Sequence, residues 1–303
     1  MTTLLKTVTP EMPRLQIVPA ESLVLHEQSD DQRSRPLAGR LRAEGVLKNP
    51  PLVAPLREEP GQPPARFASR PGMPQEGEQK YVVLDGANRT TALRQLNLPA
   101  ILVQIIRYDS NEVRLSTWNH VVAKMDPDTL INGIRKLDGV ELLETNLLDA
   151  RADLARRDIL AYLACPDGTV IAVHPETHAL RPRTDLLNKM VDSYKDDCRL
   201  YRANTDDPEE VLDYYEDVAA LVVFPHYDPA EVQAIARDGI HLPAGITRHV
   251  VSGRAMRLNY PLEELAKASS LQEKNTRFSE WIKEKMSKKE VRYYEEPTFL
   301  FDE

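Results

Sequence analysis

The chain is poor in cysteine and has no long apolar run, and each shortage excludes a class of protein. Cys165 and Cys198 are the only cysteines among 303 residues, and neither belongs to a CxxC pair. We therefore expect reduced thiols, without a disulfide framework or a structural zinc site. No apolar stretch approaches the roughly 20 residues that a membrane helix needs. The first residues lack the pattern of a signal peptide, which predicts a cytoplasmic protein.

Basic residues are outnumbered by acidic ones. The chain has 39 Lys and Arg residues against 47 Asp and Glu residues, a net charge of −8. DNA-binding proteins usually have a basic patch, because phosphate contacts supply much of the affinity. Here the basic residues are spread among acidic ones, apart from residues 33–42. Nucleic acid is therefore an unfavoured partner. The motifs GxxxxGK[ST], GxGxxG and GxSxG are missing too, and no cluster of side chains identifies metal ligands.

The apolar pattern predicts a mixed α/β fold with two domains, residues 1–108 and 109–303. Residues 57–79 contain five prolines and three glycines and are predicted to be a flexible insertion. Strands are expected at 16–25, 52–55, 81–84, 101–106, 170–173 and 219–224, with a strand pair at 246–260 and a last strand at 293–301. Helices are expected before Gly45 and at 90–96, 111–122, 127–137, 141–163, 184–201, 209–217, 229–239 and 261–288.

A short polar segment between an apolar run and a helix is the first candidate site. It contains Asp85, Gly86, Ala87, Asn88 and Arg89, and Thr90 follows. The N–H groups at the start of a helix lack partners within the helix, and the helix dipole is positive there, so such a turn suits an anion. A guanidinium fork at Arg89 fits phosphate. The alternative is an ordinary connection in which Asp85 or Asn88 caps the helix.

Three further segments are candidates. Glu27 follows an apolar strand and could emerge at a sheet end as a general base, although a solvated loop carboxylate is the commoner case. Trp118 and His120 could line a pocket or pack in the core. The segments PAGITR, with Thr247 and Arg248, and SGR, with Ser252 and Arg254, combine small residues and arginines. They could bind phosphate or carboxylate, or form two exposed turns.

These segments together resemble the ParB/sulfiredoxin superfamily, and within it the free L-serine kinases. GVLKNPPLV at 45–53 resembles the superfamily's helix exit. Several separated motifs, in the same order, resemble serine kinases of archaea and of siderophore biosynthesis. They are LHE at 25–27, LDGANRTTAL at 84–93, STWNH at 116–120, PAGITR at 243–248, SGRAMRLNYPLEEL at 252–265 and the closing YYEEPTFLFDE. An ordered set of motifs is more specific than any one of them.

The resemblance implies phosphoryl transfer from ATP or ADP to the hydroxyl of free L-serine, giving O-phospho-L-serine as a precursor for a siderophore or diaminopropionate metabolite. It implies that Glu27 is the catalytic base and that residues 86–90 bind the nucleotide phosphates in domain 1–108. Asp85 would orient the turn or a Mg²⁺ ion. The second domain would complete the substrate site: Trp118 and His120 would shape the serine pocket, and Thr247, Arg248, Ser252 and Arg254 would hold phosphate or the serine carboxylate.

One position departs from the family. The related kinases have His before the Arg of this turn, where this chain has Asn88. Asn can donate a hydrogen bond to phosphate but has no charge. A non-catalytic, nucleotide-binding transcriptional regulator on the ParB-like scaffold is therefore the second hypothesis, and a ParB-like nuclease is the third. The sequence leaves the choice between ATP and ADP, the choice between serine and an analogue, and the oligomeric state open.

Overall fold

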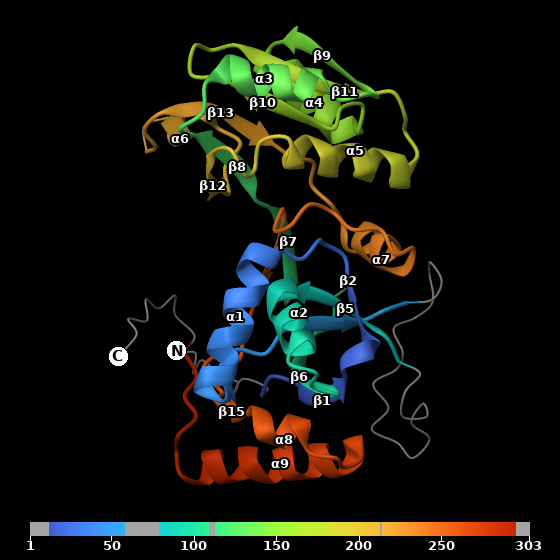
Figure 1. Cartoon of the computed structure of the whole chain (residues 1–303), viewed down its shortest axis with the longest axis vertical. Coiled ribbons are helices and arrows are strands. Elements are labelled where there is room, and N and C mark those ends of the chain that lie inside the picture. The colour runs from blue at the N-terminus through green and yellow to red at the C-terminus, as the bar shows by residue number, and fades with distance from the viewer. Residues whose placement is uncertain (1–11, 58–78, 109–112, 213, 295–303) are drawn as a thin grey trace, which may run out of the picture.

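The computed structural model describes residues 12–57, 79–108, 113–212 and 214–294. Figure 1 shows two bodies of mixed α/β structure joined by a long ribbon. The α/β fold class predicted from the sequence is confirmed. The expected insertion at 57–79 and the expected strand at 293–301 fall almost wholly outside the described residues.

The first body contains a five-stranded mixed sheet in the order β1-β6-β4-β5-β2. Its strands are β1 (Leu15–Pro19), β2 (Leu23–Leu25), β4 (Leu52–Pro55), β5 (Tyr81–Asp85) and β6 (Ala100–Ile105), with the 3-10 turn η1 (Ala20–Ser22) between the first two. Every residue of β6 is buried, as expected for a strand covered on both faces. The strand β2 pairs with β5 in parallel, so these two strands end at the same edge of the sheet.

Two helices of this body begin beside that edge. Helix α1 (Asp31–Glu44) is capped by the Asp30 side chain, which accepts from the Gln32 N–H, and it ends at Gly45 in the left-handed conformation. Helix α2 (Ala87–Gln95) follows β5 directly. It begins three residues earlier than predicted, so residues 87–89 form its first turn and are not part of a preceding loop.

The second body contains a six-stranded antiparallel sheet in the order β12-β8-β13-β10-β11-β9. Its strands are β8 (Asn119–Ala123), β9 (Val140–Thr145), β10 (Ala161–Ala164), β11 (Val170–Pro175), β12 (Arg199–Ala203) and β13 (Val218–Val223). Its helices are α3 (Pro127–Arg135), α4 (Leu147–Arg156), α5 (Leu180–Asp192) and α6 (Pro208–Leu212).

Four predicted helices of this region are wrong in whole or in part. The helix predicted at 209–217 ends at Leu212, the last residue of α6. Residues 111–122 contain β7 (Val113–Thr117) and β8, not a helix. Residues 141–163 contain most of β9, helix α4 and the start of β10, and residues 184–201 end in β12. The cause is tertiary pairing: β7 aligns with a strand more than 120 residues away, and such partners override a short apolar period in the sequence.

The two bodies are joined by a ribbon and a helix. Strand β7 pairs with β14 (Thr247–Val251) in the long ribbon of Figure 1. Helix α7 (Pro229–Arg237) packs Val232 and Ala236 against Leu52, Val82 and other buried residues of the first body. The predicted strand pair at 246–260 is wrong, because β14 pairs with β7, whereas β15 (Tyr260–Pro261) pairs with β3 (Val46–Leu47).

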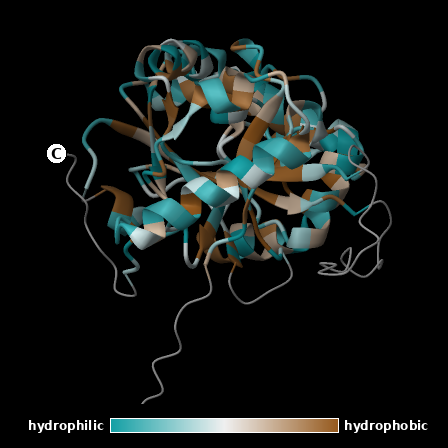
Figure 2. Ribbon diagram, turned by 90° about the horizontal axis from the view of Figure 1, so that it is seen from below, coloured by the Kyte–Doolittle hydropathy of each residue, from teal (hydrophilic) through white to brown (hydrophobic). Residues whose placement is uncertain are grey.

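The chain then returns to the first sheet. Helices α8 (Leu262–Ala266) and α9 (Leu271–Ser287) lie beneath it in Figure 1, and Figure 2 shows from below that α9 is mainly hydrophilic on the side facing the viewer. Leu265 and Phe278 belong to the first core, together with Tyr260. The division into domains at residue 108 stays a prediction, to which these contacts add that residues 260–287 pack with the first part.

One side chain fixes α9 to the sheet. The Asn275 Oδ1 atom accepts from the Ile17 N–H at 2.8 Å, and its Nδ2 atom donates to the Ile17 carbonyl at 2.9 Å. The amide therefore pairs with edge strand β1 as another strand would.

We expect Asn275→Ala to lower the free energy of unfolding by about 1–3 kcal/mol, because both backbone groups of Ile17 lose their partners. Urea denaturation at pH 7 measures this. The exposed neighbour Thr276→Ala is the control, with an expected change within about 0.5 kcal/mol. Equal losses in the two variants would contradict the assigned role.

Candidate active site

The parallel pairing of β2 and β5 brings two predicted acids to one sheet edge. Leu25 aligns with Val83 in this pairing. Glu27 and Asp85 each follow two residues later, so both emerge where the strands end. Ligand sites of α/β sheets commonly lie outside the carboxyl ends of the strands.

The Glu27 carboxylate is held by Gly245, just before β14, and by Thr247, the first residue of β14. Its Oε1 atom accepts from the Thr247 N–H at 2.7 Å and from the Thr247 hydroxyl at 2.6 Å, and its Oε2 atom accepts from the Gly245 N–H at 2.8 Å. The backbone of Leu242 also pairs with residues 26 and 28. Glu27 is therefore nearly buried, its orientation is fixed, and Oε2 has the spare acceptor capacity.

His26 is a member of this cluster that the sequence did not indicate. Its ring is 2% exposed and lies between the Val83 carbonyl, 2.7 Å from Nδ1, and the Thr247 hydroxyl, 2.9 Å from Nε2. A histidine after an apolar strand is commonly a core residue. The only signal for it was its place in the LHE segment beside Glu27.

The α2 N-terminus has the expected form for an anion site. Gly86 has φ +97°, and a Cβ atom there would lie 3.2 Å from the Pro51 Cα atom, so both conformation and space disfavour a side chain. The N–H groups of residues 87–89 are the first of the helix. The Thr90 N–H already donates to the Gly86 carbonyl, and the Thr90 side chain is buried in the core. The available amides are therefore those of 87–89.

Arg89 stabilises this turn through hydrogen bonds to the protein itself. Its Nη1 atom donates to the carbonyls of Asn49, at 2.6 Å, and Pro50, at 3.3 Å, and its Nη2 atom donates to Asp85 Oδ2 at 3.1 Å. Most of its donors are thus engaged by the protein. Arg89 positions the loop before β4 against the turn, which leaves less of its fork for a ligand than the sequence suggested.

Asp85 joins the turn to the SGR segment, because its Oδ2 atom also accepts from Arg254 Nη2. Burial alone would raise the pKa of the Asp85 carboxyl, but the guanidinium groups of Arg254 and Arg89 outweigh burial and lower it. The buried Gln104 amide holds the backbone on both sides of Arg254 through Gly253 and Ala255. Ser252, by contrast, is exposed in the same segment, with no contact in the described residues that ties it to the site.

Asn88 connects the turn with the loop after Glu27. Its Oδ1 atom accepts from the Asp30 N–H at 2.8 Å, and Asp30 is the N-cap of α1. The Asn88 amide nitrogen remains as a donor. Asn88 therefore fixes the distance between the acid-bearing loop and α2.

Trp118 and His120 have different environments. The Arg248 guanidinium lies 4.3 Å from the Trp118 ring centroid, a cation–π contact on the ribbon. His120 lies in the second core, where its Nδ1 atom is 3.0 Å from the Tyr194 hydroxyl. Burial, followed by the charges of Arg202 and Arg33, lowers the pKa of His120 to about 3. Of the two alternatives for His120, packing in the core is therefore better supported than lining a substrate pocket.

Arg202, on β12, is a further cation that no motif indicated. A Cβ atom on Gly245 would lie 1.9 Å from Arg202 Nη2, so the guanidinium lies directly over a glycine whose N–H donates to Glu27. Partial burial and the charge of Arg33 lower the pKa of Arg202. The charges of Glu27, Asp30 and Asp85 raise it, so Arg202 is within electrostatic reach of the acids at the sheet edge.

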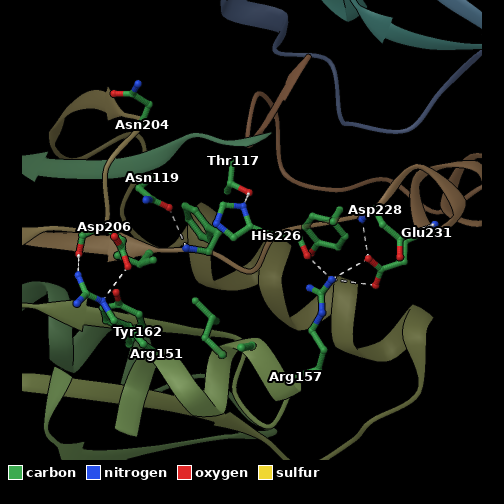
Figure 3. A pocket seen from close by; sticks show the side chains of 15 residues that line it. Thr117, Asn119, Arg151, Arg157, Tyr162, Asn204, Asp206, His226, Asp228 and Glu231 are labelled. Carbon is green, nitrogen blue, oxygen red and sulfur yellow. Dashed lines mark hydrogen bonds and ion pairs between the residues drawn. The ribbon is translucent and has the colours of Figure 1, made fainter. Parts of the chain in front are cut away.

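A cavity lies elsewhere, in the second body. It has a volume of about 490 Å³, and Thr117, Asn119 and His226 are among its lining residues (Figure 3). Its two arginines are paired with acids: Arg151 with Asp206, and Arg157 with Glu231. The N-terminus of α2 has no side-chain cap, so its amides are available and make it the better phosphate site.

Two features are absent from the part of the chain that the structure describes. The described residues contain no group of three or more His, Cys, Asp or Glu side chains arranged to hold a metal ion. None of their helices combines the length and the apolar character needed to cross a bilayer.

No protein-family model matches the chain. It is 24% identical over 292 residues to the ATP-dependent L-serine kinase SbnI of Staphylococcus aureus, covering 95% of this chain and 97% of that protein. An ATP-dependent L-serine kinase of Desulfurococcus mucosus is 29% identical over 102 residues, which cover 34% of this chain and 32% of that protein. The likeness to L-serine kinases expected from the motifs is confirmed.

Solved structures share the fold. A C-terminally truncated SbnI from Staphylococcus aureus superposes with a TM-score of 0.64 at 20% identity, covering 90% of this chain and 97% of that one. A free serine kinase in complex with AMP superposes with a TM-score of 0.66 at 18% identity, covering 84% and 95%. The arrangement of both bodies is therefore a known one.

We expect the ion pairs of Asp85 to stabilise the protein in a pH-dependent way. Because the folded-state pKa lies below the ordinary value of 3.8, the contribution is present above that value and is lost as the pH falls through the lowered pKa. Asp85→Asn should therefore lower the free energy of unfolding at pH 7, by about 1 kcal/mol or less, because Asp85 is partly exposed.

Urea denaturation of both proteins between pH 7 and pH 3 measures the difference, which should shrink in acid. Asp31→Asn is the control, since Asp31 pairs with Arg35 on the surface. A difference that grows on acidification would contradict this account.

Proposed function

We propose that this protein is a small-molecule kinase that transfers the γ-phosphoryl group of ATP to the hydroxyl of free L-serine. The observation that supports it most is the placement of one oriented carboxylate, Glu27, at the sheet edge where the α2 N-terminus begins. A general base and a phosphate cradle at one edge are what this transfer needs. The full-length similarity to an ATP-dependent L-serine kinase supports the choice of acceptor and donor.

In the proposed reaction Glu27 Oε2 accepts the serine hydroxyl proton as that oxygen attacks the γ-phosphorus. The bond from the γ-phosphorus to the β–γ bridging oxygen breaks, giving O-phospho-L-serine and ADP. The three hydrogen bonds from Gly245 and Thr247 hold the carboxylate in one orientation, so little reorganisation is required before proton transfer.

The phosphates would lie on the amides of 87–89, with Arg254 offsetting their charge. A Mg²⁺ ion, held mainly by phosphate and water, fits beside Asp85, because both arginines contact Oδ2 and Oδ1 remains as the oxygen for a cation. The ion would neutralise charge on the phosphates. The Asn88 amide nitrogen would donate to a phosphate oxygen in place of the family's His.

Arg202 is proposed to bind the serine carboxylate. It lies against Gly245, directly beside the base, and the charges of Glu27 and Asp30 act on it. Arg248, held on Trp118, is the second cation of the substrate side. A free amino acid has a carboxylate that a serine within a protein lacks, so these cations would select the free acceptor.

The first test is Glu27→Gln. Removing a general base should lower the rate of phosphoserine formation by about 10²- to 10⁴-fold. Product is measured by mass spectrometry with serine, Mg²⁺ and ATP, and then with ADP. Calorimetric ATP affinity and the far-UV spectrum should remain those of the wild type. If the wild type formed no phosphoserine with either nucleotide but bound DNA in a salt-sensitive way, the regulator hypothesis would replace this one.

The second test is Arg202→Met. Loss of a charged hydrogen bond to the carboxylate should raise the KM for serine about 10- to 100-fold. The KM for ATP should change little. Arg199→Met is the matched control: Arg199 lies three residues away on the same strand and therefore on its opposite face. An unchanged KM for serine would exclude this role.

A further inference from the structure

We propose that His26 is a positioning residue for the base: the Thr247 hydroxyl donates to Glu27 while Glu27 is ionised and turns to His26 Nε2 when Glu27 takes the substrate proton. This inference rests on the proposed function, since it concerns how the base accepts a proton. Its geometric basis is the row of atoms from Val83 through His26 and Thr247 to Glu27.

The first step fixes the His26 tautomer. The Nδ1 atom is 2.7 Å from the Val83 carbonyl, which can only accept, so Nδ1 carries a hydrogen. Burial lowers the pKa of His26 more than the charge of Glu27 and the Val83 carbonyl raise it, so the ring is neutral at pH 7. Nε2 is then an acceptor with a free lone pair.

The second step concerns the Thr247 hydroxyl, which has one hydrogen and two acceptors. Glu27 Oε1 lies 2.6 Å from it and His26 Nε2 lies 2.9 Å from it. A hydroxyl hydrogen rotates freely about its C–O bond, so either acceptor can be served without movement of heavy atoms. An ionised carboxylate is the stronger acceptor, because hydrogen bonds to charged groups are roughly twice as strong as neutral ones.

The third step follows from protonation. When Glu27 Oε2 receives the serine proton, the carboxyl becomes neutral, and Oε1 becomes a weaker acceptor that still receives the Thr247 N–H. The hydroxyl then gains more from the imidazole lone pair. With His26 present, the Thr247 hydroxyl has a strong acceptor to turn to when Glu27 is protonated, so proton transfer costs the cluster less hydrogen-bond energy.

The test uses two amide substitutions, each of which can replace only one of the two ring nitrogens of His26. In His26→Asn the side-chain nitrogen can replace Nδ1 and keep the bond to Val83, but nothing reaches the position of Nε2. In His26→Gln the amide oxygen can reach the position of Nε2 and accept from Thr247. We expect kcat to fall about tenfold in His26→Asn, as for one hydrogen bond lost in the transition state, with the KM values for serine and ATP nearly unchanged. His26→Gln should recover most of kcat.

His178→Asn, at an exposed position, is the control and should keep the wild-type kcat. Equal kcat losses in the Asn and Gln variants, or a rise in KM in place of a fall in kcat, would overturn the inference. Urea midpoints identify any loss that comes from unfolding.

A second readout does not depend on activity. In ¹⁵N-histidine spectra of the wild type, His26 should have a protonated Nδ1 and an unprotonated Nε2 with little hydrogen bonding. In Glu27→Gln, where the neutral amide stands in for the protonated acid, the Nε2 resonance should move upfield as Thr247 donates to it. An unmoved resonance would refute the switch even in an active kinase. A shifted resonance in a protein that made no phosphoserine would refute the proposed function alone.

Discussion

The acceptance of three hydrogen bonds by one carboxylate holds the candidate site together. Glu27 follows strand β2 of the first sheet, and its donors at Gly245 and Thr247 lie about 220 residues later, just before and at the first residue of the ribbon strand β14. These hydrogen bonds orient the base and fix the ribbon against the sheet edge. They also place Gly245 under the guanidinium of Arg202. The orientation of the Glu27 carboxylate and the position of the ribbon thus depend on the same hydrogen bonds.

The arginines of the site have two roles: some stabilise the protein's own loops, and others are available to bind substrate. Arg89 donates mainly to backbone carbonyls and Asp85, so it maintains the shape of the phosphate turn. Arg254 shares Asp85 but is partly exposed, and Arg202 and Arg248 lie on the side of the second body. A nucleotide and an amino acid together bring several negative charges, and cations from both bodies would compensate them. Substrate binding would therefore also tie the bodies together.

The sequence predicted most elements of the first body well, because its strands are short apolar runs and are separated by turns with glycine or proline. The α2 N-terminus was predicted because it follows a clear strand, whereas Glu27 was singled out by the resemblance of the LHE segment to the free L-serine kinases. The prediction failed for β7, whose partner β14 lies more than 120 residues away, and for β9, whose leucines mimic a helical apolar period. Arg202 and His26 could not be found, since an exposed arginine and a histidine beside a strand have many ordinary roles. Their importance arises only from the neighbours that the fold supplies.

The Asn275 amide has a consequence for the order of synthesis. The edge strand β1 is made first, yet the partner of its Ile17 backbone is made near the end of the chain. During translation this edge is open while the whole second body emerges, and open strand edges invite pairing with other chains. The edge of the first sheet is therefore covered only after α9 has been synthesised. A nascent chain that stops before α9 exposes the backbone of β1 to pairing with other chains.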